Sequence, residues 1–137
     1  MKLRDTSVLV DIDRGGVAER VAGLDDEGRH AISIVTVTEL QLGVNRRYDP
    51  ETPAYDRAVE DLARLLSRFD PVDVTRPIAV AAADIIADLQ EGGAALNDLH
   101  GVYIAATART ERLPVLTANV DHFERIDDVR VVDWTTY

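Results

Sequence analysis

Apolar residues along the chain follow two patterns, short continuous runs and stripes with a spacing of three or four residues, and the two patterns alternate. The segment 31–35 reads Ala-Ile-Ser-Ile-Val, which is typical of a buried strand. Between Pro53 and Phe69 the apolar residues recur at helical spacing, which predicts one amphipathic helix. Its stripe consists of Val59, Leu62, Ala63, Leu66 and Phe69.

The same patterns predict the remaining elements and, with them, the fold class. We expect strands at Leu3 and its neighbours, 31–35, 72–74, 114–117 and 129–132. We expect helices at 7–13, 17–24, 36–45, 53–69, 78–89, 98–110 and 120–126. Such alternation indicates a three-layer α/β fold, a short parallel sheet flanked by helices. A length of 137 residues suits one domain, residues 1–137.

Oxygen-bearing side chains recur where the predicted strands end. Ligands of parallel α/β sheets bind beyond the carboxyl ends of the strands, so these side chains are candidates for one site. Carboxylate and amide oxygens, with no cysteine in the chain, favour Mg²⁺ or Mn²⁺. Such an ion can activate a water and neutralise a phosphate. The candidates are Asp5, Thr36, Glu39, Asp98, Thr117, Asn119 and Asp121.

Each candidate also has a structural interpretation as a helix cap. Asp5 and Asn119 stand where a helix N-cap is expected, and either Asn97 or Asp98 could cap the helix that follows. Thr36 and Glu39 have the spacing of a capping box. Capping and ligand binding are compatible, because helix N-termini also attract anions such as phosphate.

His30 and His100 add little to the prediction of the site. His30 precedes a strand and is expected at the surface, whereas His100 lies on the helix near the candidate site.

The acidic composition of the chain is in apparent conflict with a site that handles phosphate. The formal net charge is -10 and Lys2 is the only lysine, which argues against binding a polyanion. Adaptation to high salt, as in a halophile, accounts for this bias, because molar salt shortens the Debye length to about 3 Å and weakens self-repulsion. No signal peptide or membrane-spanning run is seen, so we expect a cytoplasmic protein without membrane contact.

Four segments, in order, resemble the PIN domain, specifically the VapC-type toxin ribonucleases. They read Leu-Arg-Asp-Thr-Ser at 3–7, Thr-Val-Thr-Glu-Leu at 36–40, Tyr-Ile-Ala-Ala-Thr-Ala at 103–108 and Leu-Thr-Ala-Asn-Val-Asp-His-Phe at 116–123. The resemblance implies an Mg²⁺- or Mn²⁺-dependent endoribonuclease, the toxin of a type II toxin–antitoxin module. It also implies a homodimer, an RNA substrate and a VapB-like antitoxin whose tail crosses the acidic cleft.

The resemblance also implies roles for particular residues. Asp5 is the first metal ligand and Glu39 the second. Asn119 takes the position just after the fourth strand, with Asp121 as the nearest carboxylate. His122 stands where the family often has an aspartate. Water would attack the scissile phosphorus in line, leaving a 5′-phosphate and a 3′-hydroxyl.

Gly101 departs from the family pattern, which has a third acidic ligand three residues before Ile104. Asp98 lies one turn earlier, and an axial offset of about 5.4 Å is too large for an unchanged metal–oxygen bond. We therefore expect an inactivated form, in which Gly101→Asp restores cleavage. The alternative is a catalytically dead PIN domain that binds antitoxin or RNA. A phosphotransfer enzyme phosphorylated on Asp5 is disfavoured, because Ser7 replaces the second aspartate such enzymes need.

Overall fold

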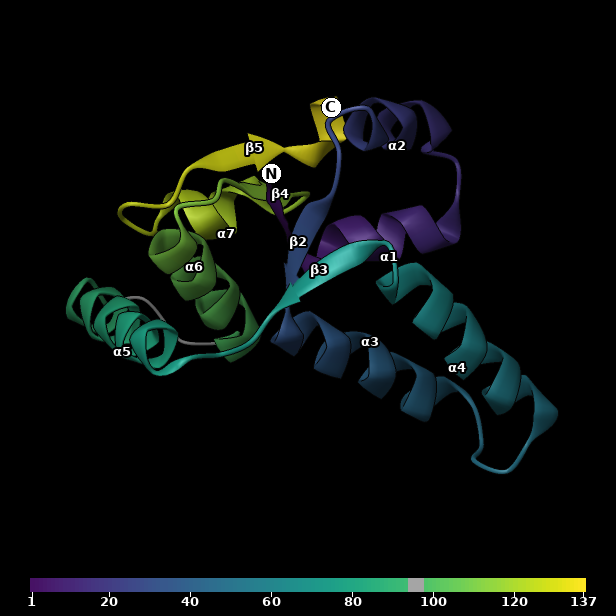
Figure 1. Cartoon of the computed structure of the whole chain (residues 1–137). Coiled ribbons are helices and arrows are strands. Elements are labelled where there is room, and N and C mark those ends of the chain that lie inside the picture. The colour runs from purple at the N-terminus through teal and green to yellow at the C-terminus, as the bar shows by residue number, and fades with distance from the viewer. Residues whose placement is uncertain (94–97) are drawn as a thin grey trace.

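The five strands of the computed structural model, which describes residues 1–93 and 98–137, form one parallel sheet (Figure 1). The strand order is β3-β2-β1-β4-β5, and each neighbouring pair is parallel. The expected α/β fold with a short parallel sheet is thus confirmed. The strands are β1 Leu3–Arg4, β2 His30–Ser33, β3 Phe69–Val72, β4 Val115–Thr117 and β5 Val131–Asp133.

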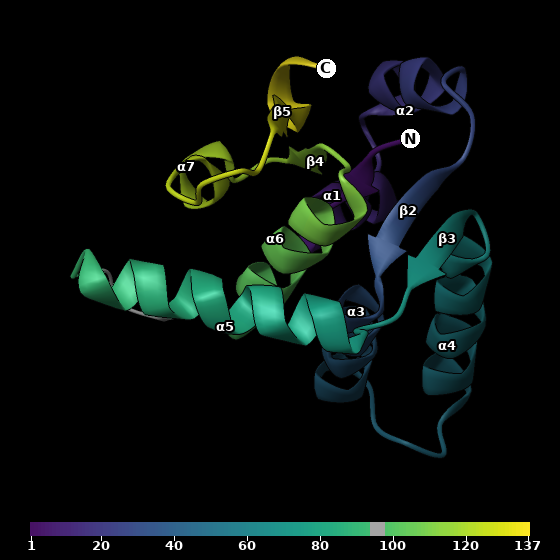
Figure 2. The same cartoon turned by 60° about the vertical axis from the view of Figure 1, so that its left-hand side comes forward.

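Helices cover both faces of this sheet (Figures 1 and 2). Leu3, Ala31 and Val115 are paired across three strands and pack with helices α5, α6 and α7. Ile32 and Leu116, one residue further along their strands, pack on the other face with α1 and α2. The helices are α1 Thr6–Arg14, α2 Ala18–Asp25, α3 Ile34–Arg47, α4 Pro53–Leu66, α5 Arg76–Glu91, α6 Leu99–Glu111 and α7 Val120–Glu124, and a 3-10 turn η1 covers Trp134–Thr136.

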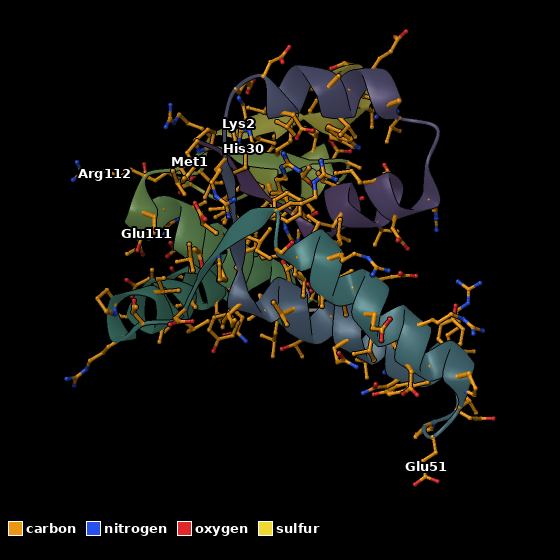
Figure 3. All side chains as sticks on the ribbon, turned by 45° about the vertical axis from the view of Figure 1, so that its right-hand side comes forward. Met1, Lys2, His30, Glu51, Glu111 and Arg112 are labelled. Atoms are coloured by element: carbon orange, nitrogen blue, oxygen red, sulfur yellow. The ribbon has the colours of Figure 1, made fainter. Side chains whose placement is uncertain are left out.

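The α3–α4 hairpin projects away from the sheet. Both ribbon views show it as an arm, and Figure 3 places Glu51 at its tip. Thr52 caps α4 by accepting a hydrogen bond from the Tyr55 backbone N–H at 3.2 Å. The amphipathic helix predicted from the apolar stripe is therefore present.

The boundaries around β2 and β3 differ from those predicted. Ser33 caps α3 through a 3.2 Å hydrogen bond from the Val35 backbone N–H, so the helix begins at Ile34 and not at 36. The capping box of Thr36 and Glu39 is therefore wrong. Phe69 belongs to β3 and not to the preceding helix, because pairing with His30 places it in the core as part of the sheet.

His30 is buried, contrary to expectation. Its side chain lies inside the fold beside Lys2 (Figure 3), with 1% of the residue exposed. Its Nδ1 accepts from the Lys2 backbone N–H at 3.0 Å and its Nε2 lies 3.1 Å from the Leu24 carbonyl oxygen. Burial lowers the pKa of His30, which keeps the ring neutral between these two backbone partners.

None of the helices in the described ranges, 1–93 and 98–137, is long and apolar enough to cross a membrane.

Candidate metal site at the carboxyl edge of the sheet

Asp5 follows β1 directly and stands at the carboxyl edge of the sheet. Only 6% of the residue is exposed. Its Oδ2 accepts hydrogen bonds from the Ser7 and Thr117 hydroxyls, both at 2.8 Å. Asp5 occupies the N-cap position of α1, but its side chain makes no capping hydrogen bond there. The two hydroxyls therefore hold one carboxylate oxygen, Oδ2, in place.

Glu39 lies in the second turn of α3 and is tied to the residue next to Asp5. Its Oε1 accepts a hydrogen bond from the Thr6 hydroxyl at 2.8 Å. The Thr6 hydroxyl also lies 3.1 Å from that of Thr36, and Glu39 Oε2 lies 3.8 Å from His100 Nδ1. Ser33 is the N-cap of α3, so Thr36 and Glu39 do not cap the helix. Their side chains instead contact the Thr6 hydroxyl, next to Asp5.

Several charged and polar groups act on the pKa of the Glu39 carboxyl. Burial raises the pKa of the Glu39 carboxyl, and the charges of Asp5 and Asp98 raise it further. The Thr6 hydrogen bond and His100 act in the opposite direction and lower it. A cation placed among these carboxylates would relieve their repulsion.

The loop after β4 is joined to Asp5 through the same hydroxyls. The Asn119 backbone N–H donates to the Thr117 hydroxyl at 2.9 Å, and the Ala118 backbone N–H donates to Ser7 Oγ at 3.1 Å. Asn119 stands at the N-cap of α7 without a side-chain capping bond, so its amide is not used there. These bonds hold the strand end beside Asp5.

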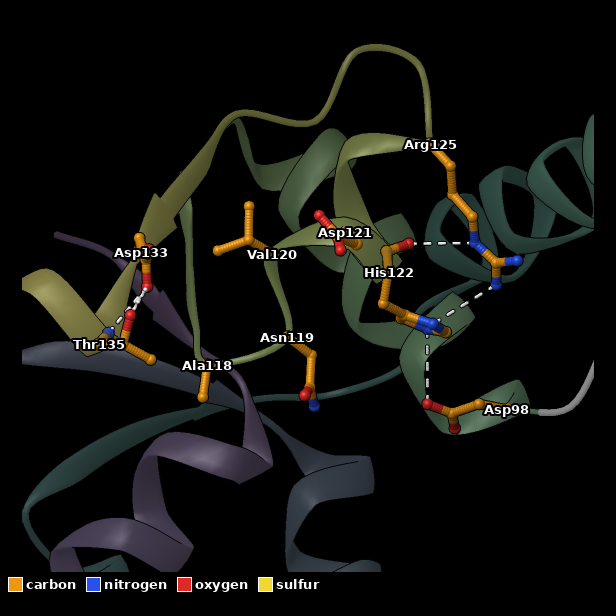
Figure 4. A pocket seen from close by; sticks show the side chains of 9 residues that line it. All are labelled: Asp98, Ala118, Asn119, Val120, Asp121, His122, Arg125, Asp133 and Thr135. Atoms are coloured by element: carbon orange, nitrogen blue, oxygen red, sulfur yellow. Dashed lines mark hydrogen bonds and ion pairs between the residues drawn. The ribbon is translucent and has the colours of Figure 1, made fainter.

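A pocket of about 610 Å³ extends from this loop along α7 (Figure 4). Asp98, Asn119 and the exposed Asp121 are among the residues that line it. Unlike Asp5, Asp121 has no hydrogen bond to the hydroxyl network in the described part of the chain. The lining residues are Asp98, Ala118, Asn119, Val120, Asp121, His122, Arg125, Asp133 and Thr135.

The space above Gly101 is filled by side chains from two other positions. Asp98 is the N-cap of α6, and its Oδ1 accepts from the Gly101 backbone N–H at 3.0 Å. A Cβ on Gly101 would lie 2.6 Å from Asp98 Oδ2 and closer still to His122 Nε2. The backbone of Asp98 lies before α6, but its side chain folds back over the first turn of the helix. The expected offset of about one turn from position 101 therefore does not apply to the Asp98 carboxylate. The alternative cap, Asn97, lies outside the described residues.

The donors fit a divalent cation in kind. Within residues 1–93 and 98–137, no three carboxylate or imidazole side chains stand close enough to hold a metal ion as they lie. Asp5 and Glu39 nevertheless offer hard oxygens from neighbouring strand ends, the type that Mg²⁺ and Mn²⁺ bind. Gly101 has no side chain to offer, and the space above it is occupied by Asp98 and His122. The separate donors at this edge of the sheet would have to move closer to one another to hold one cation.

A parallel sheet with helices on both faces and acidic side chains at its carboxyl edge defines an α/β protein with its candidate site where such folds bind ligands. The PIN-domain family model matches residues 2–129, so the chain belongs to the PIN-domain family. This confirms the resemblance drawn from the four sequence segments.

Similar proteins agree with that assignment. Ribonuclease VapC2 of Haemophilus influenzae is 29% identical over 133 residues, covering 95% of each chain. The tRNA(fMet)-specific endonuclease VapC of Shigella flexneri is 30% identical over 110 residues, 80% of this chain and 79% of its own. The structure of DNA-bound VapBC from Salmonella typhimurium is 25% identical, covers 98% of both chains and has a TM-score of 0.79.

The hydroxyl network and the His122 contact were not predicted from the sequence. Thr117 was a candidate because it ends a strand. Thr6 and Ser7 appeared only as members of the segment 3–7, without a role of their own. Their role depends on α1 beginning immediately after Asp5, a boundary that only the fold sets. His122 carried a signal, its place before Phe123, but its contact with Asp98 joins residues 24 positions apart, 98 to 122.

Proposed function

We propose that the chain is a divalent-metal-dependent endoribonuclease, the toxin of a type II toxin–antitoxin module. The observation that carries this is the link from Glu39 through Thr6 to Asp5 and from Asp5 through Thr117 to the Asn119 loop. These contacts connect residues at the ends of three strands, which supports a shared site there. The VapC relatives named above are ribonucleases, which supports RNA as the substrate.

Mg²⁺ or Mn²⁺ would be held by Asp5 and Glu39, with Asn119 beside them. A bound cation supplies a polarised water and a counter-charge for the scissile phosphate. The Ser7 and Thr117 hydroxyls keep Asp5 Oδ2 in place, which would leave Oδ1 to bind the cation. The Thr6 hydroxyl orients Glu39 in the same way. In-line attack by water would leave a 5′-phosphate and a 3′-hydroxyl.

A VapB-like antitoxin is the partner we propose. A groove of about 530 Å³ runs between α1, α3 and α4 and ends at Thr6 and Glu39. Its apolar wall includes Leu40, Val44 and Leu62. An amphipathic segment lying in it could carry a cationic side chain to the carboxylates. We also propose a homodimer, which the resemblance implies, and a location in the cytoplasm, which was expected from the sequence.

Gly101 favours a second candidate, a catalytically dead PIN domain that holds an antitoxin or RNA without cutting it. Titration with Mn²⁺ separates the two candidates, because a dead site should bind the ion weakly. The geometry above Gly101 bears on this choice, since the position is filled by other donors and is not empty.

The decisive experiment is cleavage of end-labelled tRNA and mRNA with Mg²⁺ or Mn²⁺ and with EDTA. We expect metal-dependent cleavage that Asp5→Asn lowers at least about 100-fold, because the bound ion contributes several kcal/mol. Asp56→Asn, at an exposed site on α4, removes the same charge and should cleave normally. Full activity in EDTA, or an active Asp5→Asn protein, would refute the proposal.

A further inference from the structure

The two side chains above Gly101 come from different elements and meet there. Asp98 precedes α6 and His122 lies on α7, yet His122 Nε2 is 3.5 Å from Asp98 Oδ2. Figure 4 shows His122 between Asp98 and Arg125. Any side chain at position 101 would displace them, because a Cβ there lies 2.6 Å from Asp98 Oδ2. The contact therefore depends on Gly101.

The neighbours of His122 select which ring nitrogen carries hydrogen. Arg125 Nε donates to the His122 carbonyl at 3.1 Å, which brings Arg125 Nη2 to 3.5 Å from His122 Nδ1. A guanidinium only donates hydrogen bonds, so Nδ1 is the acceptor and Nε2 carries the hydrogen toward Asp98. Within the described residues this buried Nε2 has no hydrogen-bond partner. Closing the 3.5 Å gap to Asp98 would satisfy it.

We infer that Asp98 supplies the third acidic ligand in place of a residue at 101, and that His122 is the positioning residue that holds it. The inference rests on the metal site of the proposed function. The Gly101 N–H holds Oδ1 and the His122 ring faces Oδ2. A carboxylate has about four lone-pair sites, so both oxygens keep capacity for a cation. Partners of metal-bound carboxylates orient the ligand in this way.

Under this inference Gly101 is needed to leave room for Asp98 and His122, and it is not simply a lost ligand. The variant Gly101→Ala, which adds no ligand, distinguishes these two hypotheses. If the position were simply vacant, alanine would be neutral or would stabilise the helix. If Asp98 and His122 use the space, alanine pushes their flexible ends away and weakens metal binding while the fold remains.

The experiment is Mn²⁺ affinity measured by calorimetry on the folded full chain, with urea unfolding as a separate readout. Asp98→Asn keeps a good N-cap but removes the charge, so affinity should fall with little loss of stability. His122→Ala should lower affinity about 10- to 100-fold, and His122→Gln, which keeps a donor, should recover part of it. Gly101→Ala should resemble His122→Ala.

The control is Glu124→Gln, an exposed position on α7, which removes one charge without touching the pair. Unchanged Mn²⁺ affinity in Asp98→Asn, or in both His122→Ala and Gly101→Ala, would overturn the inference. Metal-dependent cleavage by the parent in that case would leave the ribonuclease proposal intact. Conversely, the expected loss of affinity without any RNA cleavage would support the inference and refute the ribonuclease.

Discussion

At the scale of single residues, hydrogen bonds from hydroxyl groups hold the carboxylates of Asp5 and Glu39 in position. Thr117 is fully buried and makes two bonds, one to Asp5 Oδ2 and one from the Asn119 N–H. A hydrogen bond to a charged group is worth more than one between neutral groups. The hydroxyl of Thr117 therefore contributes to both stability and ligand geometry.

Replacing Thr117 with valine tests this contribution. We expect Thr117→Val to lower the free energy of unfolding by about 1.5–3 kcal/mol, since a buried carboxylate loses a donor. Mn²⁺ affinity should fall as well. Thr107→Val is the matched control, because Thr107 is equally buried but donates only to the Tyr103 carbonyl of its own helix. Urea unfolding and calorimetry measure the two effects, and equal losses in both variants would contradict the assignment.

The raised pKa of the half-buried Glu39 predicts that its charged form costs stability. Its pKa is raised in the folded state, first by burial, so it favours the fold while protonated and this contribution is lost as pH rises through the folded pKa. Glu39→Gln should therefore match the parent in acid and be more stable than the parent at neutral pH in EDTA. Added Mn²⁺ should stabilise the parent and reduce the difference.

Urea unfolding at several pH values measures this difference. Glu60→Gln, on the exposed face of α4, is the control and should show no such trend. A Glu39→Gln protein less stable than the parent at neutral pH would show that the Thr6 hydrogen bond outweighs burial.

At the scale of elements, the sequence predicted what depends on local pattern and missed what depends on pairing. The alternation of runs and stripes sufficed to predict the parallel α/β fold. The strand ends made Asp5, Glu39 and Asn119 candidates, and their roles remain predictions. The start of α3 was missed because Ser33 sits inside an apolar run that looks like strand throughout. Phe69 was missed because it fits the helical period equally well, and only pairing with β2 makes it strand.

Position 101, where the family has its third acidic residue, is another case in which the sequence pattern alone misses a contact set by the fold. Helical spacing places residue 98 a full turn from residue 101, but a capping residue lies outside the helix and its side chain reaches back. The sequence contained both Gly101 and His122 as departures from the family pattern. Only the structure shows that the two departures meet.

At the scale of the whole molecule, the net charge of -10 has to be reconciled with a polyanionic substrate. A cation in the carboxylate site offsets the charge locally, and screening offsets it globally. Exposed pairs such as Arg29 with Asp70 lose strength in salt too, but such pairs contribute little to stability. We therefore expect repulsion among surface carboxylates to be the larger electrostatic effect at low ionic strength. Adaptation to salt remains a prediction.

We expect stability to rise with KCl, because the Debye length falls from about 10 Å at 0.1 M to about 3 Å at 1 M. The test is the free energy of unfolding in urea across that range, with EDTA present. The control is a protein carrying Asp56→Asn, Asp84→Asn and Asp88→Asn, three exposed positions on α4 and α5, which takes the net charge from -10 to -7. Its low-salt stability should be higher and its dependence on KCl smaller, since less repulsion is left to screen. If KCl stabilised both proteins equally, the effect would come from general salting-out and the charge would need another explanation. If KCl destabilised the parent, surface ion pairs would outweigh repulsion and the proposed adaptation to salt would be wrong.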